Sequence, residues 1–185
     1  GYARVNPEAI VAMRPDVLAL SCYIWNWKYC LSLARAVKES NPDCFVILGG
    51  PQVPDPDRGA VGFLTFHTEV DVLVHGEGEK AFRDVLLNPH YQHHHNIPGT
   101  TSRIDKDIQN GGPGVRFTDL NELPSPYTMG LFDKHMEIDR DWHALWETHR
   151  GCPYSCTFCD WGSAVQAKIT EINVDRAIDE VRWFG

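Results

Sequence analysis

The sequence has no apolar run that approaches the ~18–20 residues of a membrane span, and its first residues show no signal-peptide pattern. Positive charge is also scarce, because 17 Lys and Arg stand against 25 Asp and Glu, for a formal net charge of −8. Nucleic-acid backbones are bound by clustered basic side chains, so nucleic acid is not an expected partner. We therefore expect a cytoplasmic protein with no membrane span.

Cysteine is sparse outside one short stretch. Three of the six cysteines, Cys152, Cys156 and Cys159, lie in HRGCPYSCTFCDWG with the spacing C-x3-C-x2-C. In a reducing compartment such a cluster is more typical of a metal or catalytic site than of a disulfide framework. No fourth cysteine follows before Gly185, so the motif is one thiol short of a closed four-cysteine site.

The first 90 residues repeat one unit, in which an aspartate precedes a short apolar run. The runs are PDVLALS (15–21), PDCFVIL (42–48) and VDVLVHG (70–76). Runs rich in Val, Ile and Leu on both faces are typical of buried parallel strands.

Helical patterns lie between these runs. They are NPEAIVAMR, with Asn6 as a cap, NWKYCLSLARAVKES, with Asn26 as a cap, EKAFRDVLL, and a weaker pattern between Gly59 and Glu69. The alternation predicts a Rossmann-like (flavodoxin-like), doubly wound parallel α/β sheet over residues 1–95.

Ligands bind such sheets beyond the carboxyl ends of the strands. Here those ends carry SCYIWNW, GGPQVP and GEGE. Gly49 and Gly50 permit close approach of a ligand to the backbone, and Ser21 offers a hydroxyl beside them. Glycine after a strand is equally typical of an ordinary turn, so the local sequence leaves both interpretations open.

The alternation stops after the third helix. Residues 96–142 predict a short hairpin and a proline-kinked linker at LPSPY, and the histidines at 93–95 suit a solvated loop better than a metal site. A strand over 143–150 leads into the cysteine motif, and NVDRAIDEVRWF predicts a helix capped by Asn173. Because one strand, one loop and one helix cannot bury a core, we expect residues 143–185 to begin a second, truncated domain.

Three thiolates can hold several kinds of metal centre. Zinc takes four protein ligands in structural sites, and His149 could complete a Cys3His set. A four-iron cluster held by three thiolates leaves one iron without a protein ligand, so that this iron can chelate a substrate. An open coordination position of this kind is typical of catalytic metal sites. Phe158, just before the third cysteine, can shield such a cluster from water. A thiol redox pair is a further alternative.

These motifs together resemble one protein family. C-x3-C-x2-C after a strand, with an aromatic residue before the last cysteine, resembles the signature of the radical S-adenosylmethionine (radical SAM) superfamily. The flanks ETHRGCPYSCTFCDWGSA, and the stretches SCYIWNW to GGPQVP and DVLVHGEGEKAF, resemble the branch with an N-terminal cobalamin-binding domain. LPSPY resembles the linker of that branch, so the resemblance covers nearly the whole chain.

The resemblance implies that Cys152, Cys156 and Cys159 ligate a 4Fe-4S cluster whose fourth iron chelates S-adenosylmethionine. Phe158 would then pack beside the cluster and the adenine. It implies an enzyme that cleaves S-adenosylmethionine reductively to a 5′-deoxyadenosyl radical, with flavodoxin or ferredoxin as electron donor and a small-molecule substrate. The second domain would be the first βα unit of a partial (β/α) TIM-type barrel, and we expect this chain alone to be inactive.

The resemblance also implies that Ser21, Gly49 and Gly50 cradle the nucleotide tail of a cobalamin, which serves methyl transfer in the cobalamin-dependent members. The fingerprint D-x-H-x-x-G is absent, and we expect the first strand of the domain to precede Gly1. Trp25 and Trp27 are packing residues or line the cofactor crevice.

Two other functions are compatible with the same sequence features. One is a non-catalytic zinc- or cobalamin-binding module, and the other is a ligand-binding or interaction domain with a vestigial cysteine loop. The remaining cysteines, Cys22, Cys30 and Cys44, are expected to be small buried hydrophobic residues.

Overall fold

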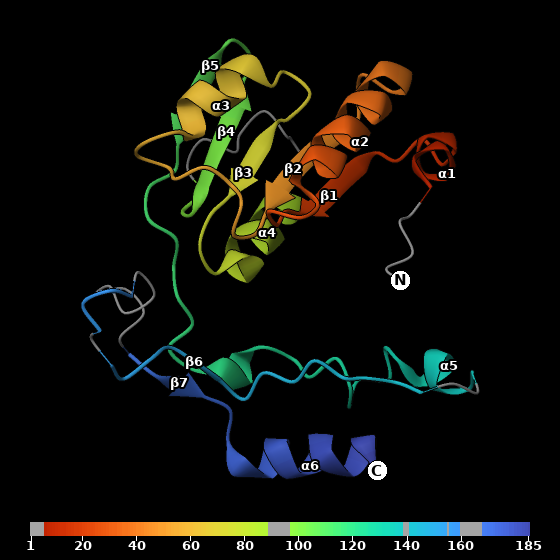
Figure 1. Cartoon of the computed structure of the whole chain (residues 1–185), viewed down its shortest axis with the longest axis vertical. Helices are drawn as coiled ribbons and strands as arrows, with labels where there is room; N and C mark the ends of the chain where they lie inside the picture. The colour runs from red at the N-terminus through yellow and green to blue at the C-terminus, as the bar shows by residue number, and fades with distance from the viewer. Residues whose placement is uncertain (1–5, 89–96, 139–140, 155, 160–167) are drawn as a thin grey trace. The chain divides into compact units, whose positions relative to one another are not determined.

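The computed structural model describes residues 6–88, 97–138, 141–154, 156–159 and 168–185 (Figure 1). The chain forms two compact units, Gly1–Arg116 and Phe117–Gly185, which are described separately below as the first and second unit. Within the described ranges, no helix is both long and apolar enough to cross a membrane.

The first unit contains a five-stranded sheet with the order β1-β2-β3-β4-β5. The strands are β1 (Val17–Ser21), β2 (Phe45–Gly49), β3 (Val72–Val74), β4 (Thr100–Ile104) and β5 (Asp107–Asn110). The three strands predicted from the apolar runs pair in parallel, which confirms an α/β sheet. The predicted hairpin forms as β4 and β5, but it extends this sheet through antiparallel pairing with β3.

All four predicted helices of the first unit form. They are α1 (Pro7–Ala12), α2 (Trp27–Ser40), α3 (Ala60–Phe66) and α4 (Gly78–Leu87). The Asn6 side chain caps α1 by accepting a hydrogen bond from the Glu8 backbone N–H at 3.0 Å. Asn26 is the N-cap residue of α2, as predicted, but its side chain makes no capping hydrogen bond and bonds instead to the loop that precedes the helix.

The two faces of this sheet carry different apolar cores, since neighbouring residues of a strand point to opposite sides. One core joins Leu18, Val46 and Leu48 to α2 and α3, and it includes the buried thiols of Cys22, Cys30 and Cys44 as predicted. The other core joins Ile47, Val72 and Val74 to Ala81 and Val85 of α4. The sheet therefore has helices on both faces (Figure 1).

The second unit has little regular structure. Its described elements are the 3-10 helix η2 (Leu120–Glu122), α5 (Asp133–Met136), β6 (His149–Arg150), β7 (Thr170–Glu171) and α6 (Val174–Phe184). The helix predicted after the cysteine motif is confirmed, and Asn173 caps it by accepting from the Arg176 N–H at 2.7 Å. The predicted strand over 143–150 is confirmed only in its last two residues, which pair with β7 in antiparallel register.

Candidate functional site

A cavity of about 540 Å³ lies at the carboxyl ends of β1, β2 and β3. Its lining residues are Ala19, Leu20, Ser21, Ile47, Gly49, Gly50, Val74, Gly76, Gly78, Glu79 and Phe82. The structure thus brings Ser21, at the end of β1, together with Gly49 and Gly50, at the end of β2. The volume falls within the roughly 300–1,000 Å³ typical of small-molecule sites.

Gly50 shapes one wall of the cavity through a close backbone approach. Its φ is +97°, and a Cβ at this position would lie 2.7 Å from the Cys22 carbonyl oxygen. The Cys22 N–H donates to the Gly49 carbonyl at 2.7 Å, and the Gln52 N–H donates to the Cys22 carbonyl at 3.1 Å. The loops after β1 and β2 are therefore held together in a way that only glycine at position 50 permits.

Gly49 has a different role. A Cβ here would come no closer than 3.8 Å to the Val74 Cβ, which is an ordinary contact distance. Packing therefore does not require glycine at position 49. Its missing side chain instead leaves space on the cavity side of β2, next to the exposed Ser21 hydroxyl of β1.

The loop after β1 is fixed by the Asn26 side chain. Its oxygen accepts from the Tyr23 N–H at 2.7 Å, and its amide nitrogen donates to the Ser21 carbonyl at 2.9 Å. Tyr23 and Trp25 stack with ring centroids 4.6 Å apart, and Trp25 is 75% exposed. Trp27 instead packs against Phe63, at 5.3 Å between ring centroids. Of the two tryptophans considered for the crevice, Trp25 is the one with an accessible ring.

The loop after β3 contains two polar interactions that sequence reasoning missed. The His75 Nε2 lies 2.8 Å from the Thr101 Oγ1, and burial lowers the pKa of the imidazole, which is therefore neutral at pH 7. Glu77 forms an ion pair with Arg116 at 2.7 Å. His75 could have been identified from the sequence as a polar residue directly after a buried apolar strand. Nothing in the local sequence indicated that Arg116 would pair with Glu77.

The cysteine loop (residues 151–159) carries three free thiols. Cys156 is exposed, and Cys152 and Cys159 are partly exposed. The Cys159 N–H donates to the Cys156 carbonyl at 3.0 Å, and Phe158 is 91% exposed. Within the described parts of the chain, no three His, Cys, Asp or Glu side chains are grouped closely enough to hold a metal ion. The predicted ligands are thus accessible but not gathered around one point.

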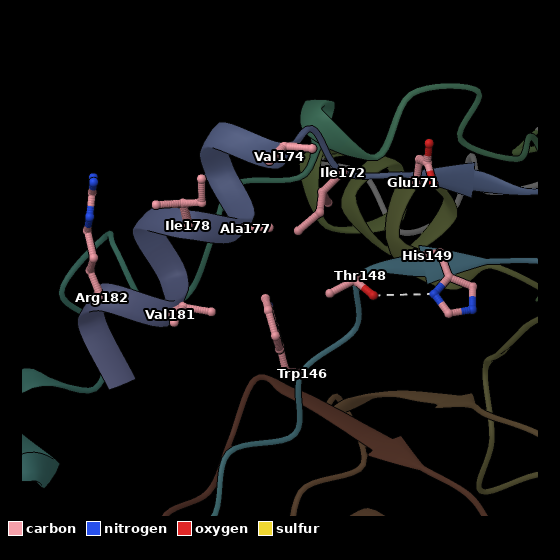
Figure 2. A pocket seen from close by; sticks show the side chains of 10 residues that line it. All are labelled: Trp146, Thr148, His149, Glu171, Ile172, Val174, Ala177, Ile178, Val181 and Arg182. Atoms are coloured by element: carbon pink, nitrogen blue, oxygen red, sulfur yellow. Dashed lines mark hydrogen bonds between the residues drawn. The ribbon is translucent and has the colours of Figure 1, made fainter. Parts of the chain in front are cut away.

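His149, the fourth ligand of the zinc hypothesis, lines a second cavity of about 340 Å³ in the second unit (Figure 2). Its Nδ1 lies 3.3 Å from the Thr148 Oγ1. The other lining residues are mainly apolar and come from α6, β7 and the segment before β6: Trp146, Glu171, Ile172, Val174, Ala177, Ile178, Val181 and Arg182. This cavity lies along the apolar side of α6.

A buried carboxylate ties α6 to the segment that leads into the cysteine loop. Glu180 is fully buried and accepts hydrogen bonds from the Trp146 Nε1 and, at 2.9 Å, from the Arg176 Nε. Arg176 also donates to the Leu120 carbonyl at 3.0 Å. Burial by itself would raise the pKa of Glu180, but the hydrogen bonds from Ser125, Arg176 and Trp146 outweigh it and hold the pKa below its ordinary value.

Comparison with known proteins agrees with this architecture. Residues 6–86 match the family model of the B12 binding domain. The chain is 44% identical, over 177 residues, to 2-(S-pantetheinyl)-carbapenam-3-carboxylate methyltransferase of Streptantibioticus cattleyicolor, with 92% of this chain and 26% of that protein covered. It is 43% identical to the cobalamin-dependent radical SAM methyltransferase TokK of Streptomyces tokunonensis, with 99% and 27% covered.

A solved structure shows the same fold. The cobalamin-dependent S-adenosylmethionine radical enzyme OxsB superposes with a TM-score of 0.66 at 20% identity, over 95% of this chain and 24% of that one. The chain therefore spans about a quarter of the length of these relatives. From the domain match and the relatives together, the chain belongs to the radical SAM proteins that carry an N-terminal B12-binding domain, which here occupies residues 6–86.

Proposed function

We propose that this chain is the cofactor-binding portion of a cobalamin-dependent radical SAM methyltransferase. The observation that carries the proposal is the cavity at the carboxyl ends of β1, β2 and β3, inside the segment that matches the B12 binding domain. The relatives' methyltransferase activity supports the reaction class. The substrate is a small molecule, and flavodoxin or ferredoxin is the proposed electron donor.

The residues around the cavity fit a cobalamin. The absent side chain of Gly49 leaves room on the floor, and Ser21 offers an exposed hydroxyl at the edge. Gly50 keeps the adjoining loop close to Cys22, so the backbone itself forms the wall. These three residues would hold the nucleotide tail, and the exposed Tyr23–Trp25 stack would offer its flat surface to the corrin ring. When bound here, cobalamin would supply a transferable methyl group.

The cysteine loop fits an iron–sulfur cluster by the chemistry of its donors. Cys152, Cys156 and Cys159 are free and at least partly accessible, and thiolates are the protein ligands of such clusters. Three thiolates leave one iron for the amino and carboxylate groups of S-adenosylmethionine. Phe158, exposed in this structure, would cover the cluster and the adenine. A reduced 4Fe-4S cluster would supply the electron for reductive cleavage of S-adenosylmethionine.

The second unit is proposed to begin a partial (β/α) barrel, with β6 as its first strand and α6 as its first helix. α6 carries Val174, Ile178 and Val181 on the side that lines the second cavity, and all three remain at least 43% exposed (Figure 2). An apolar helix stripe of this kind is typical of a helix that packs inside a larger domain. Turnover would therefore require the further length that the relatives possess.

Anaerobic reconstitution with iron and sulfide tests the cluster. We expect about four irons per chain, as for a cubane cluster, and an EPR signal of the reduced protein that changes when S-adenosylmethionine is added. Cys156→Ala should abolish the signal, whereas Cys30→Ala, a substitution in the core of the first unit, should retain it. A colourless protein that keeps one zinc would contradict the proposal and favour the zinc-binding module.

A further inference from the structure

The floor of the first cavity is apolar. Ala19 of β1 pairs in register with Ile47 of β2, and Val74 of β3 lies on the same face of the sheet. Ile47 and Val74 are buried in the core beneath α4, and the partly buried Phe82 of α4 packs against that core. None of these four side chains carries a hydrogen-bond donor or acceptor.

The polar side chains of the cavity lie at its rim. Ser21 ends β1 and Glu79 stands in the first turn of α4, and both are exposed. Because both side chains are exposed to water, they are better placed to contact ribose hydroxyls at the mouth of the cavity than a base that lies on its floor. The cavity therefore has an apolar floor and a polar rim.

We propose that this cavity selects corrinoids by their lower base, accepting a benzimidazole and discriminating against a purine. This inference rests on the proposed function, in which the cavity takes the nucleotide tail of a cobalamin. Dimethylbenzimidazole presents methyl groups and ring carbons to Ala19, Ile47, Val74 and Phe82, so its burial is favourable. Adenine would place its amino group and ring nitrogens against the same four side chains, which offer no hydrogen-bond partner, and an unpaired buried polar group weakens binding.

Three corrinoids separate the possibilities. The 185-residue chain is titrated with hydroxocobalamin, with adenine-bearing pseudocobalamin, and with cobinamide, which has no nucleotide tail. We expect Kd for hydroxocobalamin to be lower by at least about tenfold than for pseudocobalamin, the scale on which unpaired polar groups discriminate. Cobinamide should also bind more weakly than hydroxocobalamin.

Each of the other outcomes contradicts either the base selection or cobalamin binding as a whole. Equal Kd values for hydroxocobalamin and pseudocobalamin would overturn the base selection and leave cobalamin binding intact. Cobinamide binding as tightly as hydroxocobalamin would mean that the tail does not occupy the cavity, which also overturns the inference. Binding of none of the three would overturn cobalamin binding in the proposed function, and the base selection with it.

A matched pair of variants locates the effect. Val74→Thr keeps nearly the same shape but adds a hydroxyl to the floor, so it should reduce the preference for hydroxocobalamin over pseudocobalamin by roughly threefold or more. Val61→Thr makes the same change at a half-exposed position of α3, on the opposite face of the sheet, and should leave the ratio unchanged. If a folded Val74→Thr protein showed the same ratio of the two Kd values as the wild type, the inference would be contradicted. If neither variant folds, the Kd values of the wild-type protein still test the inference.

Discussion

Gly50 lies so close to Cys22 that a Cβ at position 50 would meet the Cys22 backbone nitrogen at 2.9 Å and its carbonyl oxygen at 2.7 Å. The contact joins the loops that follow β1 and β2, which form the wall of the proposed cobalamin cavity. The packing of one glycine thus connects the sequence motif GGPQVP to the shape of the site.

Gly50→Ala should lower both stability and hydroxocobalamin affinity. The methyl group would clash with Cys22, and the φ of +97° is a strained conformation for alanine, which together cost about 1–3 kcal/mol or more. Chemical denaturation and a cobalamin titration measure the two effects. Gly62→Ala is the matched control, because its Cβ would meet nothing within 4 Å in α3 and should stabilise by about 0.5–1 kcal/mol. Equal stability of both variants would contradict the proposed cavity wall.

Glu180→Ala should destabilise the second unit by about 2 kcal/mol or more, because it removes a fully buried side chain together with its hydrogen bonds from the Arg176 Nε and the Trp146 Nε1. Thermal unfolding followed by tryptophan fluorescence measures the loss. Asp179→Ala, on the same helix, removes an exposed ion pair with Arg182 and should cost less than about 1 kcal/mol. Similar losses in the two variants would mean that the Glu180 contacts contribute little.

The Glu180 carboxylate should make the stability of the folded chain depend on pH. Its pKa is lowered in the folded protein, so its contribution to stability is present above the unfolded value of 4.5 and is lost as the pH falls through the folded pKa. Between pH 6 and pH 3 the wild-type chain should therefore lose more stability than Glu180→Gln, which has no charge to protonate. Parallel pH profiles of the two proteins would contradict this assignment.

His75 should remain neutral to a lower pH than a free histidine. Burial lowers its pKa below 6.5, so the unfolded chain takes up the proton first, and stability falls as the pH drops below 6.5. An NMR titration of the imidazole resonances checks the direction. Thr101→Val, which removes the hydroxyl 2.8 Å from Nε2, should weaken the fixed ring orientation without exposing the site. A pKa above 6.5 would show that the ring is not desolvated.

The six thiols should divide into two equal classes. Burial raises the pKa values of Cys22, Cys30 and Cys44, so these thiols stay protonated and shielded. A thiol reagent at pH 8 should label the three cysteines of the loop rapidly and the others only after denaturation. Reconstitution with iron and sulfide should then protect the rapid class. More than three rapid thiols in the folded protein would contradict the buried positions.

Short apolar runs predicted the core of the first unit well, because parallel strands are buried on both faces and leave a clear pattern. Ser21, Gly49 and Gly50 could be grouped from the rule that ligands bind at strand ends, and the structure places them in one cavity. The sequence did not show why position 50 requires glycine, because the requirement comes from the backbone of Cys22, which is distant in the sequence.

Long-range polar contacts explain most of what the sequence did not predict. Asn26 looks like a helix cap, but Tyr23 and Ser21 compete successfully for its side chain. Glu180 reads as an exposed helix residue until Trp146 and Arg176 enclose it. The predicted strand over 143–150 is short because only His149 and Arg150 pair with β7.

The most direct test of the central claim is a metal analysis of the reconstituted chain, with cobalt, iron and zinc measured in one sample. After anaerobic incubation with iron, sulfide and hydroxocobalamin and removal of the excess, we predict about one cobalt and, for a cubane cluster, about four irons per chain. Gly50→Ala should lose the cobalt alone, and Cys156→Ala the iron alone. A chain that retains zinc in place of iron and binds no cobalt would contradict the account.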